Sequence, residues 1–127
     1  MGTWYEIQHT TGFVFQPDWM DCTRAQYTNF NADELTFDVY NSSQFGFLPT
    51  SGSHGTASCA NMPNGQCAVS FNGAEVDEPN YFILDTDYVS YTMVYACESS
   101  DSALLWIMSR TPTMDKALLD KLNADAL

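Results

Sequence analysis

The chain has 127 residues, of which 45% are apolar and 14% aromatic, and its formal net charge is −12. This length provides one domain with a sizeable core, and the composition excludes a disordered chain. Only Arg24, Arg110, Lys116 and Lys121 carry a fixed positive charge, which disfavours nucleic acids and anionic membranes as partners. No apolar run approaches the ~18 residues that a membrane-spanning helix needs.

Eight strand-like runs rich in Tyr, Phe, Val, Ile and Thr follow one another, with turn signals between them. They cover residues 3–10, 22–30, 35–41, 54–60, 66–71, 81–87, 88–97 and 103–110. Apolar and polar residues alternate within several runs, so that Leu35, Phe37 and Val39 share one face. Eight closely spaced strands with hairpin-length links predict an all-β fold, either an up-and-down antiparallel barrel or a sandwich.

The tail changes to a helical period. Residues about 114–123 place Met114, Leu118 and Leu122 on one face, and Thr113 is the expected N-cap. We therefore expect one amphipathic helix on the outside of the sheet. Residues 1–127 then form a single domain, with strands over about residues 2–110.

Three distant segments meet at one end of an eight-stranded meander. They are Gly2–Trp4 at the first strand, Asp85–Tyr88 between the sixth and seventh strands, and Arg110 after the eighth. If the sheet closes on itself, the Arg110 guanidinium can stack on the Trp4 indole, a contact worth ~0.5–2 kcal/mol. Gly2 gives the incoming chain room, and Asp85, Thr86 and Asp87 are suited to ordering a tight turn through side-chain hydrogen bonds. This predicts a barrel that is plugged at one end.

These segments resemble the three signature motifs of the lipocalin family: GTW at residues 2–4, TDY at residues 86–88, and Arg110 at the end of LLWIMSR. Their order and spacing agree along essentially the whole chain. The stretch YFILDTDYVSYTMVYAC is most similar to apolipoprotein D and to the insect and crustacean pigment-binding branch, with its crustacyanin-like and bilin-binding proteins. The resemblance implies an eight-stranded up-and-down barrel, with one C-terminal α-helix outside, that holds a small hydrophobic molecule.

Strand alternation predicts which side chains line the barrel. If Arg110 points inward, so do its neighbours at every second position of the eighth strand. On the seventh strand the larger aromatic face is expected inside, and on the sixth the face that avoids burying Asp85. The predicted lining is Leu104, Trp106, Met108, Tyr91, Met93, Tyr95, Phe82, Leu84, Phe37 and Val39.

Five further residues complete the predicted ligand site. The resemblance implies that Tyr27, like Trp106, occupies a pocket position of apolipoprotein D-like lipocalins. Phe45 and Phe47 fall in the loop expected at the open rim. Glu6 and Gln8 share the face of Trp4, where either could hydrogen-bond a ligand, unless a bulge turns both outward.

An aromatic and methionine-rich wall suits flat or extended apolar ligands. We expect an extracellular carrier that holds its ligand non-covalently, with a pigment such as a carotenoid favoured, then a bilin or a steroid, and with an amine as a further variant. Two alternatives remain open: an enzyme of the prostanoid-isomerising lipocalin type, and a ligand-free structural subunit of a larger assembly. We expect no catalytic cofactor, no nucleic acid, no membrane insertion, and a dimer or hetero-oligomer with a related lipocalin as a further partner.

Four cysteines favour an oxidising compartment. Cys59 and Cys67 flank a short hairpin link and are the expected disulfide. The resemblance implies that Cys22 and Cys97 match family cysteines whose usual partners precede the first strand and follow the helix, so here they either pair with each other or stay unpaired.

Two remaining motifs bear on processing and metal binding. Asn41-Ser42-Ser43 matches an N-glycosylation acceptor, and Met1 runs into the first strand without a signal peptide, as expected for a mature or trimmed form of a secreted protein. His9 and His54 lack a clear constellation of further ligands, so we predict no metal site.

Overall fold

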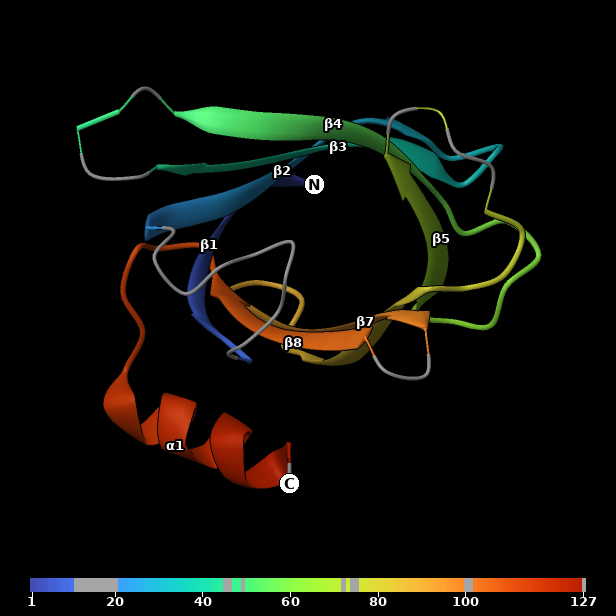
Figure 1. Ribbon diagram of the computed structural model, residues 1–127. Helices are drawn as coiled ribbons and strands as arrows, with labels where there is room; N and C mark the ends of the chain where they lie inside the picture. Colours follow the sequence, from blue (N-terminus) through green and yellow to red (C-terminus); the bar gives the residue numbers. More distant parts are fainter. Residues whose placement is uncertain are drawn as a thin grey trace.

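The computed structural model describes residues 1–10, 21–44, 47, 48, 50–71, 73, 76–99 and 102–126, with the side chains of residues 21, 98, 99 and 102 left aside. Its elements are β1 (Gly2–His9), β2 (Asp21–Asn31), β3 (Thr36–Gln44), β4 (Ser51–Ser58), β5 (Gln66–Phe71), β6 (Tyr81–Thr86), β7 (Tyr91–Ser99), β8 (Ser102–Ser109) and α1 (Lys116–Asp125). The strands form one closed barrel in sequence order, every pair antiparallel, with α1 outside the ring (Figure 1). The predicted barrel is confirmed, and the sandwich is excluded.

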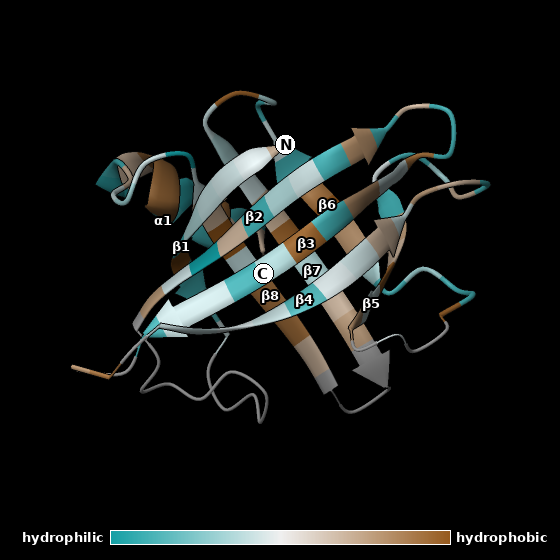
Figure 2. Ribbon diagram, turned by 90° about the horizontal axis from the view of Figure 1, so that it is seen from above, coloured by the Kyte–Doolittle hydropathy of each residue, from teal (hydrophilic) through white to brown (hydrophobic). Residues whose placement is uncertain are grey.

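Closure of the barrel comes from β1, which pairs with strands on both of its edges. Tyr5 faces Arg24 of β2 on one side and Ser109 of β8 on the other. Polar and apolar residues are interspersed along β2 and β3 (Figure 2), because successive side chains of a strand point to the inside and the outside of the barrel in turn. Phe37 and Val39 of β3 face the interior as predicted. Leu35 precedes the strand with a left-handed φ of 52° and lies exposed, so it does not share their face.

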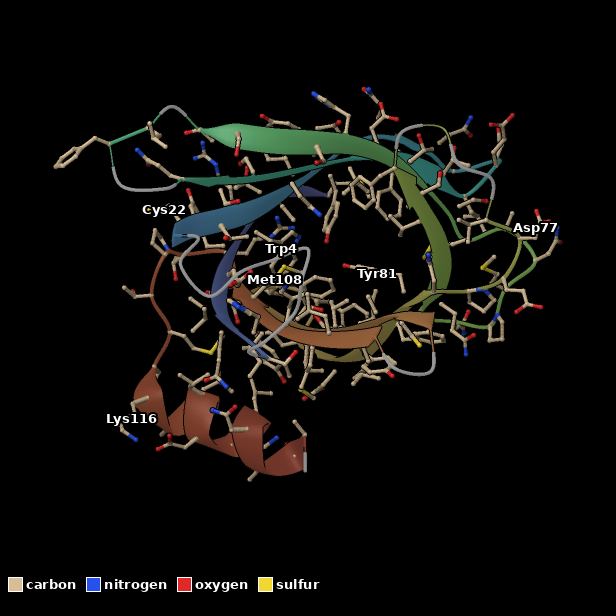
Figure 3. The ribbon with its side chains drawn as sticks, in the orientation of Figure 1. Trp4, Cys22, Asp77, Tyr81, Met108 and Lys116 are labelled. Atoms are coloured by element: carbon tan, nitrogen blue, oxygen red, sulfur yellow. A yellow bond between two sulfur atoms is a disulfide. The ribbon has the colours of Figure 1, made fainter. Side chains whose placement is uncertain are left out.

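Two apolar cores lie on opposite sides of the wall formed by β7 and β8. The inner core consists of Trp4, Ala25, Val94 and Met108, hereafter the floor cluster, and Tyr27, Tyr81 and Trp106 pack against it. Trp4, Met108 and Tyr81 all lie inside the ring of strands (Figure 3). The outer core consists of Met93, Ile107 and Leu122, and it joins the barrel to α1.

Helix α1 begins later than the sequence predicted. The N-cap is Asp115, whose side chain accepts a hydrogen bond of 3.1 Å from the Leu118 amide, so the prediction of Thr113 was wrong. The Thr113 carbonyl instead accepts a hydrogen bond from the Thr111 hydroxyl at 2.7 Å. The apolar face of α1 packs on the barrel, while Lys116 points away from it (Figure 3).

A β-bulge interrupts β1 between Glu6 and Gln8. Glu6 pairs with Met108 and Gln8 with Ile107, which leaves Ile7 as the extra residue. Gln8 consequently points outward, where its amide nitrogen donates to Asn123 Oδ1 at 2.7 Å. Glu6 stays on the cavity side, so the bulge moves one of the two predicted residues outward and not both.

Cys59 and Cys67 form the predicted disulfide, which joins the residue after β4 to the start of β5. Cys22 and Cys97 are not joined to each other, and Cys22 lies exposed at the start of β2. Within the described residues, no helix combines the length and the apolar character that crossing a bilayer would require.

Candidate functional site

The closed end of the barrel is sealed by Arg110 lying over Trp4. The guanidinium carbon is 3.8 Å from the centre of the indole ring, which confirms the predicted stacking. Nη1 also donates to the Thr3 carbonyl at 3.1 Å. Gly2 has a φ of +87°, and a Cβ added there would lie 3.0 Å from Arg110 Nη1. The glycine is therefore needed both for its backbone conformation and for the space it leaves.

The turn between β6 and β7 completes this end. The Asp87 carboxylate accepts hydrogen bonds from the backbone amides of Val89, Ser90 and Tyr91 and from the Ser90 hydroxyl. These bonds, the Ser90 hydroxyl first, hold the pKa of Asp87 well below its usual range. The Arg110 amide donates to the Ser90 carbonyl at 2.9 Å, which ties the turn to the end of β8.

Above the floor cluster the barrel contains a cavity of about 550 Å³. Its lining comes from β1 through β5, from β6 and the residue before it, and from β7 and β8. The apolar and aromatic lining residues are Ala25, Tyr27, Phe37, Val39, Val69, Phe71, Tyr81, Ala96, Leu104, Trp106 and Met108. Trp4 and Arg110 are not among the described lining residues, so Trp4 forms the part of the floor cluster that faces Arg110 and not the cavity.

The deep part of the cavity is aromatic and contains one pair of hydroxyls. The hydroxyl oxygens of Tyr27 and Tyr81 are 2.7 Å apart, and the Phe37 ring meets Tyr27 edge-on with 5.4 Å between centroids. Burial raises the pKa of Tyr27 to about 12 and raises the pKa of Tyr81 well above its ordinary value. Both side chains are therefore neutral phenols at ordinary pH.

Polar residues border the cavity where β2 begins, β3 ends and β4 begins, at the end opposite to Arg110. We call them the polar mouth: Thr23, Arg24, Asn41, Ser42, Ser43, Ser51 and Ser53. Arg24 Nε donates to the buried Ser42 hydroxyl at 3.2 Å. The Thr23 hydroxyl is buried and has no hydrogen-bond partner among the residues that the structure describes.

One carboxylate also lines the cavity. Glu6 Oε1 lies 2.5 Å from His9 Nδ1, and the two side chains are only 10% and 13% exposed. Residues three apart normally face opposite sides of a strand, so this contact depends on the bulge at Ile7. His54, by contrast, stacks on Tyr40, with ring centroids 4.4 Å apart, and neither residue lines the cavity. Over the described parts of the chain, no three His, Cys, Asp or Glu side chains gather as metal ligands would.

Seven of the predicted ligand-site residues lie together in the lining. They are Glu6, Tyr27, Phe37, Val39, Leu104, Trp106 and Met108. Phe47 is fully exposed and lies outside the lining, and Phe45 lies outside the described residues. The inward residues of β8 were predicted correctly because the inward direction of Arg110 showed which face of the alternating strand lies inside.

The face predicted for β7 was wrong. Tyr91, Met93 and Tyr95 point out of the barrel, whereas Val94 belongs to the inner core and Ala96 lines the cavity. The larger side chains are outside because Met93 and Tyr91 pack with the core beneath α1. The small inward residues leave space for the cavity.

The face predicted for β6 was wrong as well. The Phe82 and Tyr95 ring centroids lie 6.0 Å apart at an interplanar angle of 47°, Phe82 is not among the lining residues, and Leu84 is 54% exposed. Tyr81 faces the cavity instead. A register shift between Ile83 and Asp85 separates the two parts of the strand, so an inward Tyr81 does not force a buried carboxylate.

Sequence reasoning missed Tyr81, Phe71, Asn80 and the polar mouth. The amide group of Asn80 donates to the Val69 carbonyl at 2.9 Å and accepts from the Val69 amide at 2.8 Å, so it extends the β5 ladder. The serines in residues 42–53 are the one sequence feature that could have indicated the polar mouth, but their composition is typical of a loop.

Asn41, the predicted N-glycosylation acceptor, lies within the sheet. This residue is paired with Ala25 and Ser53 inside the sheet, and it is one of the cavity-lining residues. Asn41 belongs to the polar mouth, and glycosylation at this position stays a prediction.

The whole chain, residues 1–127, matches a family model described as a lipocalin-like domain. A search of curated proteins finds no match. Among solved structures, a major allergen from cockroaches superimposes with a TM-score of 0.72 at 24% identity, covering 98% of this chain and 74% of the allergen. Lobster apocrustacyanin A1 gives 0.72 at 20% identity, covering 97% and 67% of the two chains. The tryptamine complex of the amine binding protein of Rhodnius prolixus gives 0.71 at 22% identity, covering 98% and 70%. At these identities the likeness establishes a common fold.

Proposed function

This chain belongs to the lipocalin-like family, and from that premise we propose that it carries a small, largely apolar molecule inside its barrel. The observation that carries the proposal is the cavity of about 550 Å³ above a sealed floor. Binding sites for small molecules typically have volumes of about 300–1,000 Å³, mostly apolar walls and a few placed polar groups. This cavity has all three properties.

The chemistry of the lining favours a flat, rigid ligand. Tyr27, Phe37, Phe71, Tyr81 and Trp106 offer ring faces, and Met108 adapts to irregular contours. A steroid or a bilin has a compact form that suits the cavity. A carotenoid is a long rod, so we propose that it would place one end group in the barrel and extend through the polar mouth. The pigment proposal rests on the likeness of residues 81–97 to pigment-binding lipocalins.

An amine is the second candidate, because one observation favours it. Glu6 presents a carboxylate to the cavity, and a structurally similar protein is described as a tryptamine complex. Replacing Glu6→Gln should then weaken tryptamine binding, while a neutral dye in the same cavity is bound as before. Equal tryptamine affinity in the variant would remove this candidate.

An extracellular location is part of the proposal. The Cys59–Cys67 disulfide is typical of chains that fold in an oxidising compartment. The isomerase alternative needs a thiol inside the barrel, and none of the described cysteines is among the lining residues. It therefore receives no support from the cavity.

The direct test is to purify the protein from its natural source and examine what it holds. Its visible absorption spectrum, and mass spectrometry of an organic extract, should reveal a bound chromophore or a colourless small molecule. A visible band would identify a pigment. A protein that releases no small molecule and self-associates instead would point to the structural-subunit alternative and overturn the carrier proposal.

A variant pair separates binding in the cavity from binding elsewhere. Ala96→Trp should fill the lumen and abolish binding of the extracted molecule, because Ala96 lines the cavity. Ala103→Trp adds the same side chain at an exposed position of β8 and serves as the control. If both variants bind equally well, the ligand does not occupy the barrel.

A further inference from the structure

We propose that the hydroxyl pair of Tyr27 and Tyr81, hereafter the crossbar, recognises a neutral hydrogen-bond acceptor on the ligand, with a ketone as the fitting chemical class. This inference deepens the carrier function proposed above and rests on it. It assigns one polar contact to the aromatic, deep part of the cavity, and it names the chemical group on a ligand that this contact would recognise.

The crossbar spans the lumen from wall to wall. Tyr27 belongs to β2 and Tyr81 begins β6, and in the closed ring β1 to β8 these strands are four places apart in either direction. They therefore stand on opposite sides of the barrel, and the 2.7 Å between their hydroxyl oxygens bridges its interior. The Tyr81 side chain projects into the middle of the ring (Figure 3). Both rings also pack against the floor cluster, so a ligand that descends from the mouth meets the crossbar before the floor.

Counting protons shows what the crossbar offers to a ligand. Two neutral phenols carry two hydroxyl protons, and their mutual hydrogen bond uses one of them. The hydroxyl that accepts this bond keeps its own proton for another partner. That proton is a better donor than an isolated phenol, because its oxygen already accepts a hydrogen bond. A ligand carbonyl oxygen placed above the crossbar would satisfy it.

Three other polar side chains in or near the cavity already have partners of their own. Asn80 also lines the cavity, but its amide is bonded to the backbone of Val69. Arg24 belongs to the mouth and donates to Ser42, and Arg110 is stacked on Trp4. A ligand carboxylate at the depth of the crossbar would meet neutral phenols, which cannot balance its charge in a buried site. A neutral acceptor avoids that cost.

The test uses a pair of neutral dyes that differ in one group. Prodan is a dimethylaminonaphthalene with a ketone, and its emission shifts to the red when the carbonyl accepts a hydrogen bond. Dimethylaminonaphthalene lacks the ketone. The wild-type protein should bind prodan more tightly, with the emission of a hydrogen-bonded carbonyl.

Tyr-to-Phe variants locate the donor. In Tyr27→Phe or Tyr81→Phe one phenol remains with its proton no longer shared, so prodan binding should fall only slightly. In the double variant both protons are gone, and prodan affinity should fall roughly 2- to 10-fold, the range for one net neutral hydrogen bond. The prodan emission should shift to the blue, and binding of the dye without a ketone should stay unchanged. Tyr40→Phe removes a phenol outside the cavity, where Tyr40 stacks on His54, and is the matched control.

Circular dichroism and thermal melting of each variant establish that the barrel is intact. A folded double variant that binds prodan with wild-type affinity and wild-type emission would overturn the crossbar inference and leave the carrier function standing. If neither dye enters the folded wild-type barrel, the carrier function fails, and the crossbar inference fails with it.

Discussion

At the scale of single residues, the closed end of the barrel depends on a position without a side chain. Gly2 combines a left-handed backbone with a close approach to Arg110, and Arg110 in turn covers Trp4. The left-handed backbone and the lack of space beside Arg110 are separate reasons for a glycine at this position. A suitable pair of substitutions can measure them separately.

We predict that Gly2→Ala lowers the free energy of unfolding by more than the ~1–2 kcal/mol of backbone strain, because the new Cβ also displaces the guanidinium. Gly73→Ala is the matched control, since Gly73 has a φ of +74° and nothing within 4 Å of an added Cβ. Urea denaturation followed by tryptophan fluorescence measures both variants. Equal losses would show that contact with Arg110 adds nothing.

The two crossbar tyrosines make the protein sensitive to alkali. The pKa of Tyr27 in the folded protein is about 12 and that of Tyr81 is also raised, whereas in the unfolded chain both phenols titrate near 10.0. Between these values the unfolded state releases protons that the folded state keeps. We therefore predict that the stability contributed by the neutral phenols is complete below about pH 10 and is lost as the pH rises towards 12.

Urea denaturation across this pH range measures the effect, and the ultraviolet absorbance of tyrosinate reports the ionisation. The Tyr27→Phe/Tyr81→Phe double variant should lose less stability between pH 10 and pH 12 than the wild type. An identical decline in both proteins would contradict the assignment.

Single positions also show where prediction from sequence stops. The positions of Trp4 and Arg110 were predicted correctly because the three motifs must all lie at the same end of an eight-stranded antiparallel barrel. Gln8 was misplaced because a bulge at Ile7 changes the face of every residue after it. Nothing in the residues of this stretch identifies the bulge, which arises from how β1 pairs with β8.

At the scale of elements, the outer face of β7 and β8 is buried in a second apolar core, between the barrel and α1. Leu122 of α1 is fully buried against Met93 and Ile107. In a barrel without an outer helix, the larger apolar face of a strand would be the inner one, and that rule produced the wrong face for β7. The sequence shows that β7 has two different faces, but which of them points into the barrel depends on where α1 packs.

We predict that Leu122→Ala destabilises the protein by about 2–5 kcal/mol, the usual cost of removing a large buried apolar side chain. Its affinity for a ligand in the cavity should be unchanged, because Leu122 lies outside the barrel. Lys116→Ala, at an exposed position of the same helix, should change stability by less than about 0.5 kcal/mol. Thermal melting and dye binding together measure these effects. A loss of affinity in the folded Leu122 variant would mean that the helix shapes the cavity.

At the scale of the whole molecule, the barrel closes unevenly. Strands β5 and β6 share only two register pairs in the described residues, Gln66 with Phe82 and Cys67 with Tyr81. The Asn80 side chain continues this seam by bonding both polar groups of the Val69 backbone. A side chain thus replaces part of a ladder that other strand pairs form with backbone alone.

We predict that Asn80→Ala costs about 1–3 kcal/mol of stability, because it leaves the Val69 amide and carbonyl without their partner in a half-buried place. Hydrogen exchange of the Val69 amide should accelerate more than exchange of amides in β7 and β8. Glu78→Ala, at an exposed position of the same loop, is the control. Unchanged exchange at Val69 would show that the seam does not depend on Asn80.

The overall architecture was predictable because it depends on repeated features: eight strands, short links and three motifs that meet at one end. The cavity was predictable only in part. Its floor follows from Trp4, Arg110 and the alternation of β8. Its volume depends on small inward residues such as Ala96, and the inward Tyr81 goes together with a register shift between Ile83 and Asp85 that the sequence does not reveal. These features depend on how the strands pair in three dimensions, and the local sequence does not reveal them.

The pairing of β1 with β8 has a consequence for how the protein is made. Within this domain, β1 is synthesised before the other strands and waits longest for its second neighbour, because that neighbour, β8, ends at Ser109. Until then one edge of β1 offers unpaired amides and carbonyls, which can join the edge of another nascent chain. We therefore expect the nascent chain to be open to edge-to-edge association until β8 pairs with β1, which also brings Arg110 over Trp4.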